Sequence, residues 1–297
     1  MMEIPLNQST TPFNLEHTLN CGQLFRWKKL RGWWYGVVDG KVIKVKQIRD
    51  KMFFQTFPER VEPNFLENYF RLNDNLPKIL SRINKDEHVG KAIQRFRGLR
   101  IIRQEPWECL ISYICATNTN IPAIKNMILN LSKRFGRKII FEDQDFYAFP
   151  KPSDLADVDI KQVKMCKLGF RAERVLKTSR IIHNKEFDLE TLKKLDYKEA
   201  KNQLLPLPGV GQKVADCVLL FSLDKLEAFP VDVWMKRVIL EFYPKSFEES
   251  FVEKLSRRHT LTSSEYQTVS SFGRTYFGEY AGYAQEYLFA LAREGRA

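Results

Sequence analysis

Residues 205–217 read Leu-Pro-Leu-Pro-Gly-Val-Gly-Gln-Lys-Val-Ala-Asp-Cys, and residues 229–234 read Phe-Pro-Val-Asp-Val-Trp. Helical periodicity precedes and follows the first stretch, so Pro208–Gly211 is predicted to form a tight hairpin between two helices. Its glycines let backbone N–H groups approach a ligand closely, and a phosphate fits such a site best. We therefore expect Gly209, Val210 and Gly211 to contact an anionic partner.

Lys213 stands just beyond this hairpin, in the first turn of the second predicted helix. The helix macrodipole and burial in a pocket would both disfavour its ammonium form. A neutral lysine amine attacks electrophilic carbon atoms and forms Schiff bases. The alternative is a solvated lysine that contacts a phosphate, and position alone favours that alternative.

Asp232 follows Lys213 along the chain and stands directly before a predicted helix at Val233–Phe242. An aspartate in this place is a good N-cap, which is the ordinary interpretation of an isolated one. The short connection Leu223–Pro230 can nevertheless fold the two helices back on one another and bring Asp232 close to Lys213. A carboxylate there could deprotonate a nucleophile or stabilise positive charge developing on a sugar ring.

The composition agrees with a globular protein that binds a polyanion. The chain has 297 residues, enough for two packed domains, and Lys plus Arg exceed Asp plus Glu by 48 to 36, a formal net charge of +12. The five cysteines, Cys21, Cys109, Cys115, Cys166 and Cys217, are scattered singly, as is typical of reduced thiols. Without C-x-x-C or clustered histidines, we expect neither an iron–sulfur cluster nor zinc.

No targeting or membrane-spanning segment is evident. The N-terminus lacks an apolar signal region, and no apolar run is long enough to cross a bilayer as a helix. We therefore expect a cytoplasmic protein without a membrane partner.

The chain changes character near residue 97. Short alternating runs at Leu24–Lys28, Trp33–Val38, Val42–Gln47 and Met52–Phe57, with a hairpin turn at Asp39-Gly40, predict an antiparallel sheet. Helices at Phe65–Leu72 and Glu87–Arg97 would cover one face of it. The remainder is helical by period, with Glu105–Thr117, Pro122–Phe135, Phe170–His183, Tyr197–Leu204, Gln212–Ser222, Val233–Phe242 and Thr275–Arg293 as expected helices. We predict an α+β fold, with a sheet domain at 1–96 and a helical domain at 97–297 whose hairpin spans about 197–222.

Two local signals mark helix ends. Gly136 fits the C′ position after a helix, and Asp196 with Glu199 fits a capping box.

Leu207–Cys217 together with Pro230-Val-Asp232 closely resembles the helix-hairpin-helix and Gly/Pro/Asp (HhH-GPD) signature of DNA glycosylases, and in detail the 8-oxoguanine DNA glycosylase/lyase family. Further blocks that resemble the family occur in its order along the chain: Cys21–Trp27, Ile114–Ile121, Leu168–Ala172 and Gly282–Phe289. Only the segment before Cys21 and the loop between Gly136 and Val163 lack support. The resemblance implies an N-terminal sheet domain like that of the TATA-binding protein (TBP-like) before the HhH-GPD domain.

The same resemblance implies a role for single residues. Lys213 would attack the anomeric carbon of the damaged nucleotide, and Asp232 would assist electrostatically. Because the base must be flipped out of the duplex, Cys217 and Phe289 would pack on its two faces. Gln285 would bind its Watson–Crick edge, and the Gly22 carbonyl would accept the N7–H that separates 8-oxoguanine from guanine. The residues that would contact the opened duplex are Asn118, Phe170 and Arg171.

Without the resemblance, each of these residues has an ordinary structural interpretation. Cys217 and Phe289 would be core residues, and Gln285 and Arg171 would lie on the surface. Asn118 and Asn120 would simply stop a helix.

Two positions depart from the family pattern. Ala123 stands where the eukaryotic branch has a second arginine that reads the opposite cytosine, and Trp234 stands where that branch has histidine. Losing an arginine fork removes about 1–3 kcal/mol of base discrimination. We therefore expect a relaxed preference for the opposite base and leave the role of Trp234 open.

The sequence therefore predicts a bifunctional enzyme that excises 8-oxoguanine from duplex DNA and nicks the strand as an AP lyase. It would act as a monomer on the nucleoid, with no obligate protein partner and no cofactor beyond a loosely bound cation at the hairpin. One alternative is a bifunctional glycosylase for another oxidised purine. The other is a non-catalytic hairpin module that binds DNA, although such a module would not need Lys213 and Asp232 together.

Overall fold

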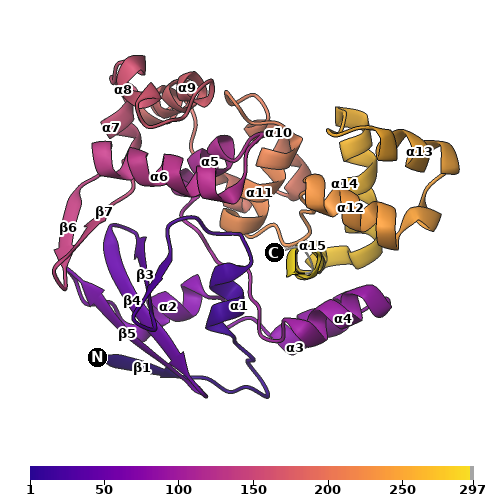
Figure 1. Ribbon diagram of the computed structural model, residues 1–297, viewed down its shortest axis with the longest axis horizontal. Coiled ribbons are helices and arrows are strands. Elements are labelled where there is room, and N and C mark those ends of the chain that lie inside the picture. Colours follow the sequence, from indigo (N-terminus) through magenta and orange to yellow (C-terminus); the bar gives the residue numbers. More distant parts are fainter. Residues whose placement is uncertain (295–297) are drawn as a thin grey trace.

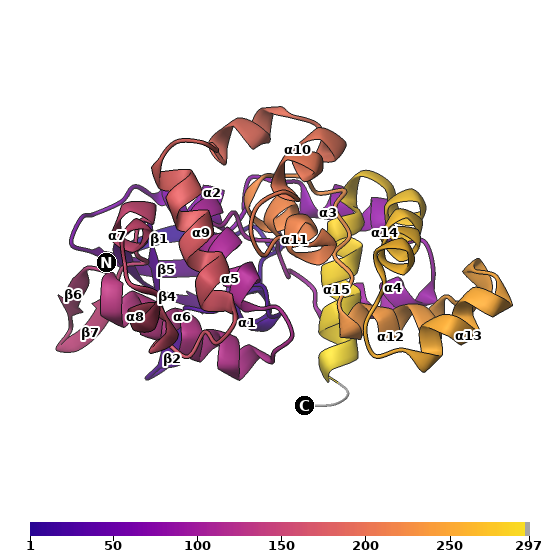
Figure 2. The ribbon, with the colours of Figure 1, turned by 90° about the horizontal axis from the view of Figure 1, so that it is seen from above.

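The computed structural model describes residues 1–294, which form a mixed α+β protein (Figures 1 and 2). The strands are β1 (Met2–Pro5), β2 (Lys28–Leu30), β3 (Trp33–Val38), β4 (Lys41–Ile48), β5 (Lys51–Phe57), β6 (Lys138–Phe141) and β7 (Gln144–Tyr147). The helices are α1 (Leu15–Asn20), α2 (Pro63–Tyr69), α3 (Leu76–Ile83), α4 (Glu87–Arg95), α5 (Pro106–Cys115), α6 (Ile121–Phe135), α7 (Pro152–Ala156), α8 (Ile160–Lys164), α9 (Arg171–His183), α10 (Tyr197–Leu204), α11 (Gln212–Ser222), α12 (Val233–Phe242), α13 (Glu249–Arg257), α14 (Ser263–Phe277) and α15 (Ala281–Glu294). Across residues 1–294, no helix has the length and apolar character needed to cross a membrane.

Strands β1 to β5 form one antiparallel sheet in the order β1-β5-β4-β3-β2. Asp39 and Gly40 have φ values of 48° and 67°, the two positive angles of a type I′ turn, so the predicted hairpin between β3 and β4 is confirmed. The strand expected at Leu24–Lys28 instead lies at Lys28–Leu30. The preceding segment is held elsewhere, because the Gln23 side chain donates to the Arg100 carbonyl and accepts from the backbone N–H of Ile102.

Helices α1 and α2 cover one face of the sheet. Trp34, Val45 and Phe54 of that face share a buried cluster with Leu19 of α1 and Leu66 of α2. Successive side chains of a strand point to opposite faces, which directs these three side chains to one side, although β3 itself is buried on both faces. The predicted α+β architecture is confirmed.

The hairpin β6–β7 covers part of the opposite face, although it lies much further along the chain. Ile139 and Phe146 join Tyr35 and Val42 in a separate cluster, and the rings of Tyr35 and Phe146 stack with centroids 5.8 Å apart. Gly136 ends α6, but in an extended conformation rather than the left-handed one expected at C′. The reason is close approach, since a Cβ at Gly136 would collide with the Ala148 carbonyl oxygen.

Helices α3 and α4 pack against α15, near the end of the described chain (Figure 2). Val89 and Ala92 of α4 belong to the large helical core that also contains Tyr287 and Leu288. The prediction that the helix starting at Glu87 covers the sheet is therefore wrong. Periodicity shows that this helix has an apolar face, but it does not show which element that face packs against. Helices α3 and α4, which precede residue 97, therefore help to form the core of the helical part that follows it.

The helix predicted at Thr275–Arg293 is two helices. Gly278, with φ at +74°, ends α14, and a short 3-10 turn leads into α15 at Ala281. A non-glycine residue would be strained at this angle. The break sets the direction of α15, which supplies one wall of the cleft described below.

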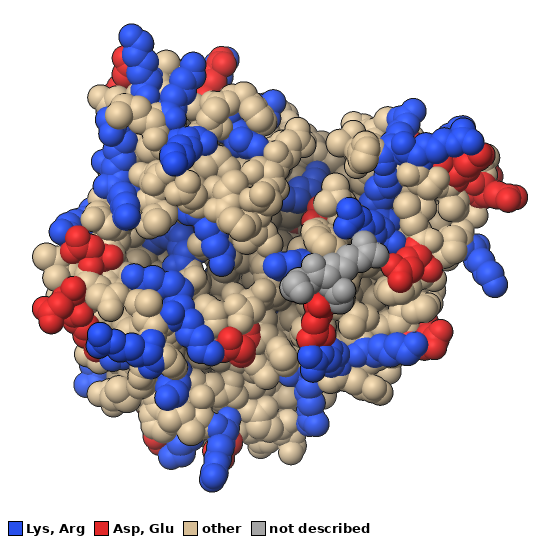
Figure 3. All heavy atoms as spheres, viewed as in Figure 1, with Lys and Arg blue, Asp and Glu red and all other residues tan. Residues whose placement is uncertain are grey.

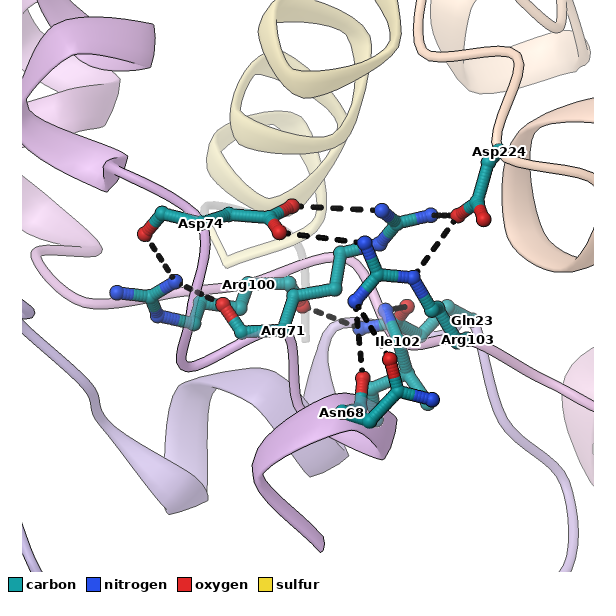
Figure 4. A network of polar contacts seen from close by, with 8 residues as sticks. All are labelled: Gln23, Asn68, Arg71, Asp74, Arg100, Ile102, Arg103 and Asp224. Atoms are coloured by element: carbon teal, nitrogen blue, oxygen red, sulfur yellow. Dashed lines mark hydrogen bonds and ion pairs between the residues drawn. The ribbon is translucent and has the colours of Figure 1, made fainter. Parts of the chain in front are cut away.

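A cluster of three arginines, of which Arg71 and Arg100 are buried, joins the N-terminal part to the connection between α11 and α12 (Figure 4). Arg71 and Arg103 both donate to Asp224 of that connection and to Asp74, while Arg100 donates to the Asp74 carbonyl. Burial acts to raise the pKa of Asp224, but the two guanidinium groups outweigh it and the pKa is lowered. The chain that leads to Asp232 is therefore anchored at its beginning.

Candidate active site

A cleft of about 1020 Å³ opens where the loop after α5, the hairpin before α11, the start of α12 and one face of α15 meet. The surface is hollowed between the lobe with α9 and α10 and the lobe with α12 and α13 (Figure 3). Ten of the twelve predicted site residues line this cleft: Gly22, Asn118, Gly209, Val210, Gly211, Lys213, Cys217, Asp232, Gln285 and Phe289. Segments as distant in the sequence as those of Gly22 and Phe289 are thus brought to one site.

The hairpin at Pro208–Gly211 has the predicted geometry. Gly209 has φ at +87°, and a Cβ there would meet the Arg174 side chain at 2.9 Å. The Pro208 carbonyl accepts a hydrogen bond from Thr178 of α9, which fixes the turn. Gly211 caps α11 without a side chain, so the first N–H groups of that helix stay open to an anion.

Lys213 is half-buried in the first turn of α11. Its Nζ lies 5.0 Å from the ring centroid of Tyr113, a buried residue that stacks on Phe221. The aromatic face attracts the ammonium group while leaving its direction free. Among residues 1–294, Lys213 forms no ion pair within 4.0 Å, whereas several other lysines do. The amine therefore stands in the cleft without a carboxylate in contact.

Asp232 is the N-cap of α12, as predicted, and one of its oxygens accepts from the backbone N–H groups of Trp234 and Met235 at 2.9 Å each. Burial raises the pKa of Asp232, although these two hydrogen bonds and the charge of Lys213 oppose the rise. The two interpretations of this residue are compatible. One carboxylate oxygen caps the helix while the residue lines the same cleft as Lys213.

Cys217 and Phe289 stand on different helices that border the cleft. Cys217 follows Lys213 by one turn of α11 and is 3% exposed, and burial raises the pKa of its thiol to about 12. The thiol is therefore neutral and available for packing against an apolar surface. Phe289 of α15 is partly exposed to the cleft and lies beneath the Arg293 guanidinium, 5.4 Å from the ring centroid.

Gln285 and Gly22 both line the cleft. Gln285 is 5% exposed, and its Oε1 has no hydrogen-bond partner within residues 1–294. Gly22 has φ at +111°, and a Cβ would meet Arg293 Nη1 at 2.5 Å and the Phe289 ring at 3.1 Å. Only glycine fits this position without displacing those side chains.

The three residues expected to meet the opened duplex lie at the edge of the site. Asn118 is exposed and adopts a positive φ of 51° between α5 and α6. Phe170 is 54% exposed at the start of α9 and does not line the cleft. Arg171 does not line it either, because its guanidinium is buried and donates to the carbonyls of Thr117 and Asn118. In this structure Arg171 therefore shapes the loop that carries Asn118.

Some residues of the site were not predicted. Glu286 and Arg293 line the cleft from α15, and Arg293 Nη1 donates to the Cys21 carbonyl at 2.8 Å, next to Gly22. Both lie on the same helix face as Phe289, at i−3 and i+4, which is the signal that could have revealed them.

Asp216 organises the base of the site from the buried side of α11. Its carboxylate accepts from the hydroxyls of Tyr197 at 2.7 Å and Tyr266 at 2.5 Å and from Lys201 Nζ at 2.9 Å. The Tyr266 hydroxyl in turn accepts from the backbone N–H of Val231, the neighbour of Asp232. This chain of contacts, which we call the Asp216 network, links the helix of Lys213 to the segment of Asp232.

All five cysteines are free and buried. Across the part of the chain that the structure describes, no group of three or more His, Cys, Asp or Glu side chains is placed to hold a metal ion.

Comparison with known proteins agrees with this geometry. A family model of the 8-oxoguanine DNA glycosylase N-terminal domain matches residues 4–110, and a model of the HhH-GPD superfamily of base excision DNA repair proteins matches residues 111–256. The fold and the hairpin with its lysine and aspartate therefore define a DNA glycosylase of the HhH-GPD class.

Its relatives narrow the assignment. The 8-oxoguanine glycosylase/lyase of Clostridium acetobutylicum, solved with duplex DNA containing cytosine opposite 8-oxoguanine, is 34% identical with a TM-score of 0.86, and the match covers 96% of this chain and 93% of that one. The N-glycosylase/DNA lyase OGG1 of Arabidopsis thaliana is 29% identical over 96% of this chain and 79% of its own length. The N-glycosylase/DNA lyase of Saccharomyces cerevisiae is 31% identical over 76% of this chain and 65% of its own length. This chain belongs to the 8-oxoguanine DNA glycosylase/lyase family.

Proposed function

We propose that this enzyme excises 8-oxoguanine from duplex DNA and then cleaves the strand at the resulting site. The proposal rests on one observation, which is that Lys213 of α11 and Asp232 of α12 line the same cleft. Cys217 and Phe289 also line this cleft, as does Gln285, whose Oε1 has no hydrogen-bond partner within residues 1–294. A phosphate-binding hairpin alone would need none of these groups.

The chemistry follows from the two catalytic residues. Lys213 Nζ forms a bond to the anomeric carbon while the bond from that carbon to the base breaks, and the base leaves with the electron pair. The negative charge of Asp232 stabilises the positive charge that develops on the sugar. Loss of a proton from nitrogen and opening of the ring then give a Schiff base. Loss of a C2′ proton expels the 3′ phosphate by β-elimination, and these steps balance without a metal or redox cofactor.

The base is recognised after it has been flipped out of the duplex. Cys217 and Phe289 pack on its two faces, Gln285 Oε1 accepts a hydrogen bond from its Watson–Crick edge, and the Gly22 carbonyl accepts from N7–H. The hairpin at Gly209–Gly211 binds the backbone, Phe170 enters the base step, and Asn118 occupies the gap.

Discrimination of the opposite base is weak in this proposal. Ala123 lies in the first turn of α6 and carries no hydrogen-bonding side chain, so one arginine fork is missing there. Rates of excision from duplexes with 8-oxoguanine opposite C and opposite A should differ little. A strong preference for C would refute this part.

We also propose where the enzyme acts and in which oligomeric state. The scattered thiols suit a reducing cytoplasm, where the enzyme would act on the nucleoid as a monomer without an obligate protein partner. Gel filtration with light scattering of the protein and its DNA complex tests the monomer.

The experiment that decides the function is borohydride trapping on a duplex with one 8-oxoguanine. The wild type should form a covalent adduct, and Lys213→Gln should form none while still binding the duplex. Lys225→Gln, which alters a lysine outside the cleft, is the matched control. Absence of an adduct with the wild type, despite binding, would leave Lys213 as a phosphate contact and refute the lyase mechanism.

A further inference from the structure

Arg293 is a cation in the cleft that no step above uses. It follows Phe289 by one turn of α15, is half-buried and lines the cleft. Its Nη1 donates to the Cys21 carbonyl at 2.8 Å, the only hydrogen bond of this guanidinium within residues 1–294. Arg71 pairs with carboxylates, whereas Arg293 forms no ion pair in that part of the chain. A guanidinium has more N–H donors than one contact uses, so the others are available to a ligand.

Contacts with Gly22 and Phe289 place this guanidinium in one corner of the cleft. A Cβ on Gly22 would lie 2.5 Å from Arg293 Nη1 and 3.1 Å from the Phe289 ring, so the three residues meet. The guanidinium carbon is 5.4 Å from the centroid of the Phe289 ring. In the proposed function, Phe289 packs on one face of the flipped base and the Gly22 carbonyl accepts from N7–H. In that arrangement, Arg293 lies beside the five-membered ring of the base, which carries N7, the oxygen at C8 and N9.

Excision creates negative charge on this five-membered ring. When the bond from the anomeric carbon to N9 breaks, the electron pair stays on N9, and resonance through C8 shares the charge with the oxygen at C8. A guanidinium binds such an anion strongly, because it stays protonated and donates charge-assisted hydrogen bonds. It binds the neutral base less strongly before cleavage, and this difference in binding is what accelerates a reaction.

We propose that Arg293 is a catalytic residue that donates a hydrogen bond to the oxygen at C8 and stabilises the base as it leaves as an anion. This inference rests on the proposed function and adds a group that acts on the leaving base, whereas Lys213 and Asp232 act at the sugar. The electron pair of the broken bond stays on the base. The proton that the alkylated Lys213 nitrogen loses afterwards neutralises the base.

The charge of Arg293 also reaches Asp232. Burial raises the pKa of the Asp232 carboxyl group, and Arg293 is among the groups that oppose the rise. Loss of Arg293 would therefore favour the protonated form of Asp232, which stabilises positive charge on the sugar or on the Schiff base less well. An effect through Asp232 would slow both base excision and cleavage of an abasic site. An effect on the leaving base would slow excision alone, because an abasic site has no base to expel.

The test measures both reactions in single turnover with saturating enzyme. The duplexes carry either 8-oxoguanine or an abasic site prepared beforehand, each opposite C. Arg293→Met and Arg293→Gln, two neutral variants, should excise 8-oxoguanine about 100-fold more slowly, the cost of removing one donor to a developing anion, and cleave the abasic site at close to the wild-type rate. Arg293→Lys keeps the charge and should recover much of the loss. Arg82→Met, which changes an exposed arginine of α3 outside the cleft, should behave as the wild type in both reactions.

A binding measurement separates stabilisation of the leaving base from recognition of the intact one. Loss of Arg293 also removes the donor to the Cys21 carbonyl, which would leave the neighbouring Gly22 freer to move. A 2′-fluoro nucleotide of 8-oxoguanine resists cleavage, because fluorine destabilises positive charge at the anomeric carbon, so its duplex measures binding alone. Both neutral variants should bind this duplex as tightly as the wild type does, since they lose an interaction made in the transition state.

The outcomes are separable. If both neutral variants slow the two reactions equally, as loss of a phosphate contact or an effect through Asp232 would, the role of Arg293 at the leaving base is overturned while the proposed function stands. Weaker binding of the uncleaved duplex that accounts for the slower excision overturns it as well. Retained cleavage of the abasic site shows, in the same sample, that a variant is folded. If the wild type binds the 8-oxoguanine duplex without excising the base, the proposed function fails and this inference fails with it.

Discussion

Asp216→Asn tests whether one buried carboxylate holds the active-site helix in place. Asp216 is fully buried and accepts from two tyrosine hydroxyls, from Lys201 and, at 3.4 Å, from Ser270. Asparagine has nearly the same shape but no charge, and it places an amide N–H₂ where one carboxylate oxygen accepts. The Lys201 ammonium, with its side chain 12% exposed, then loses its only charged partner among residues 1–294.

The size of the effect follows from these contacts. Removing one member of a buried ion pair costs about 3–5 kcal/mol, because the remaining charge stays buried without compensation. At about 2–4 °C per kcal/mol, a value for domains of 150–250 residues, the unfolding midpoint should fall by at least about 6 °C. Excision should slow as well, because the Tyr266 hydroxyl that binds Asp216 also accepts from Val231 N at 3.3 Å, beside Asp232.

Differential scanning calorimetry and single-turnover excision measure the two effects. Asp216→Asn combined with Lys201→Met removes the orphaned charge and should recover much of the lost stability, because the pair is then replaced by groups that need no partner. Tyr266→Phe is the matched control for the link to Val231, since it removes one hydroxyl and keeps the ring. A cost below about 1 kcal/mol for Asp216→Asn would refute the reasoning, because an exposed pair contributes that much.

Three further predictions concern the cleft. Gly22→Ala should slow excision about tenfold or more, because its Cβ would meet Arg293 Nη1 at 2.5 Å and the Phe289 ring at 3.1 Å, and single-turnover kinetics compare it with the wild type. Asp232→Asn keeps a good N-cap but loses the charge, so excision should fall by about 100-fold while the unfolding midpoint changes little, and a large drop in midpoint would contradict this. Burial raises the pKa of Glu286 from 4.5 to about 7 in the folded protein, so the folded state gains stability as pH falls from 7 towards 4.5, and the full cost of burying the carboxylate is present at pH 8. Glu286→Gln removes this cost and should raise the free energy of unfolding by up to about 3 kcal/mol at pH 8, but by almost nothing near pH 4.5. Denaturant titration at both pH values measures the difference.

The parts of the fold that the sequence predicts well are those decided by local interactions. The type I′ turn at Asp39-Gly40 and the capping box of Asp196 with Glu199 depend on neighbouring residues within one turn of chain, and both are confirmed. The partner of α4 and the place of β6–β7 depend on contacts between distant segments, which periodicity does not encode. Gly278 was ambiguous because a glycine inside a helical pattern is tolerated as often as it ends a helix.

The same distinction holds for the site. Lys213, Cys217 and Asp232 are marked by a short motif, and the structure brings them to one cleft. Glu286 and Arg293 look like the solvated face of a helix, and only the assembly of the cleft, which brings Cys21 and Asp232 near Glu286, shows that they belong to the site. Arg171 was predicted to contact the opened duplex, but its guanidinium is held by the carbonyls of Thr117 and Asn118, an arrangement that depends on the loop conformation.

The hairpin β6–β7 has a consequence for synthesis of the chain on the ribosome. Tyr35, Val37 and Val42 keep one face of the sheet apolar until Ile139 and Phe146 arrive to cover it. At about 5–20 residues per second, translation from the end of β5 at residue 57 to the end of β7 at residue 147 takes roughly 5–20 s. During that interval the nascent sheet exposes an apolar face, so a ribosome-bound chain that stops after α4 should bind chaperones at this face, whereas in a chain that extends past β7 the hairpin covers it.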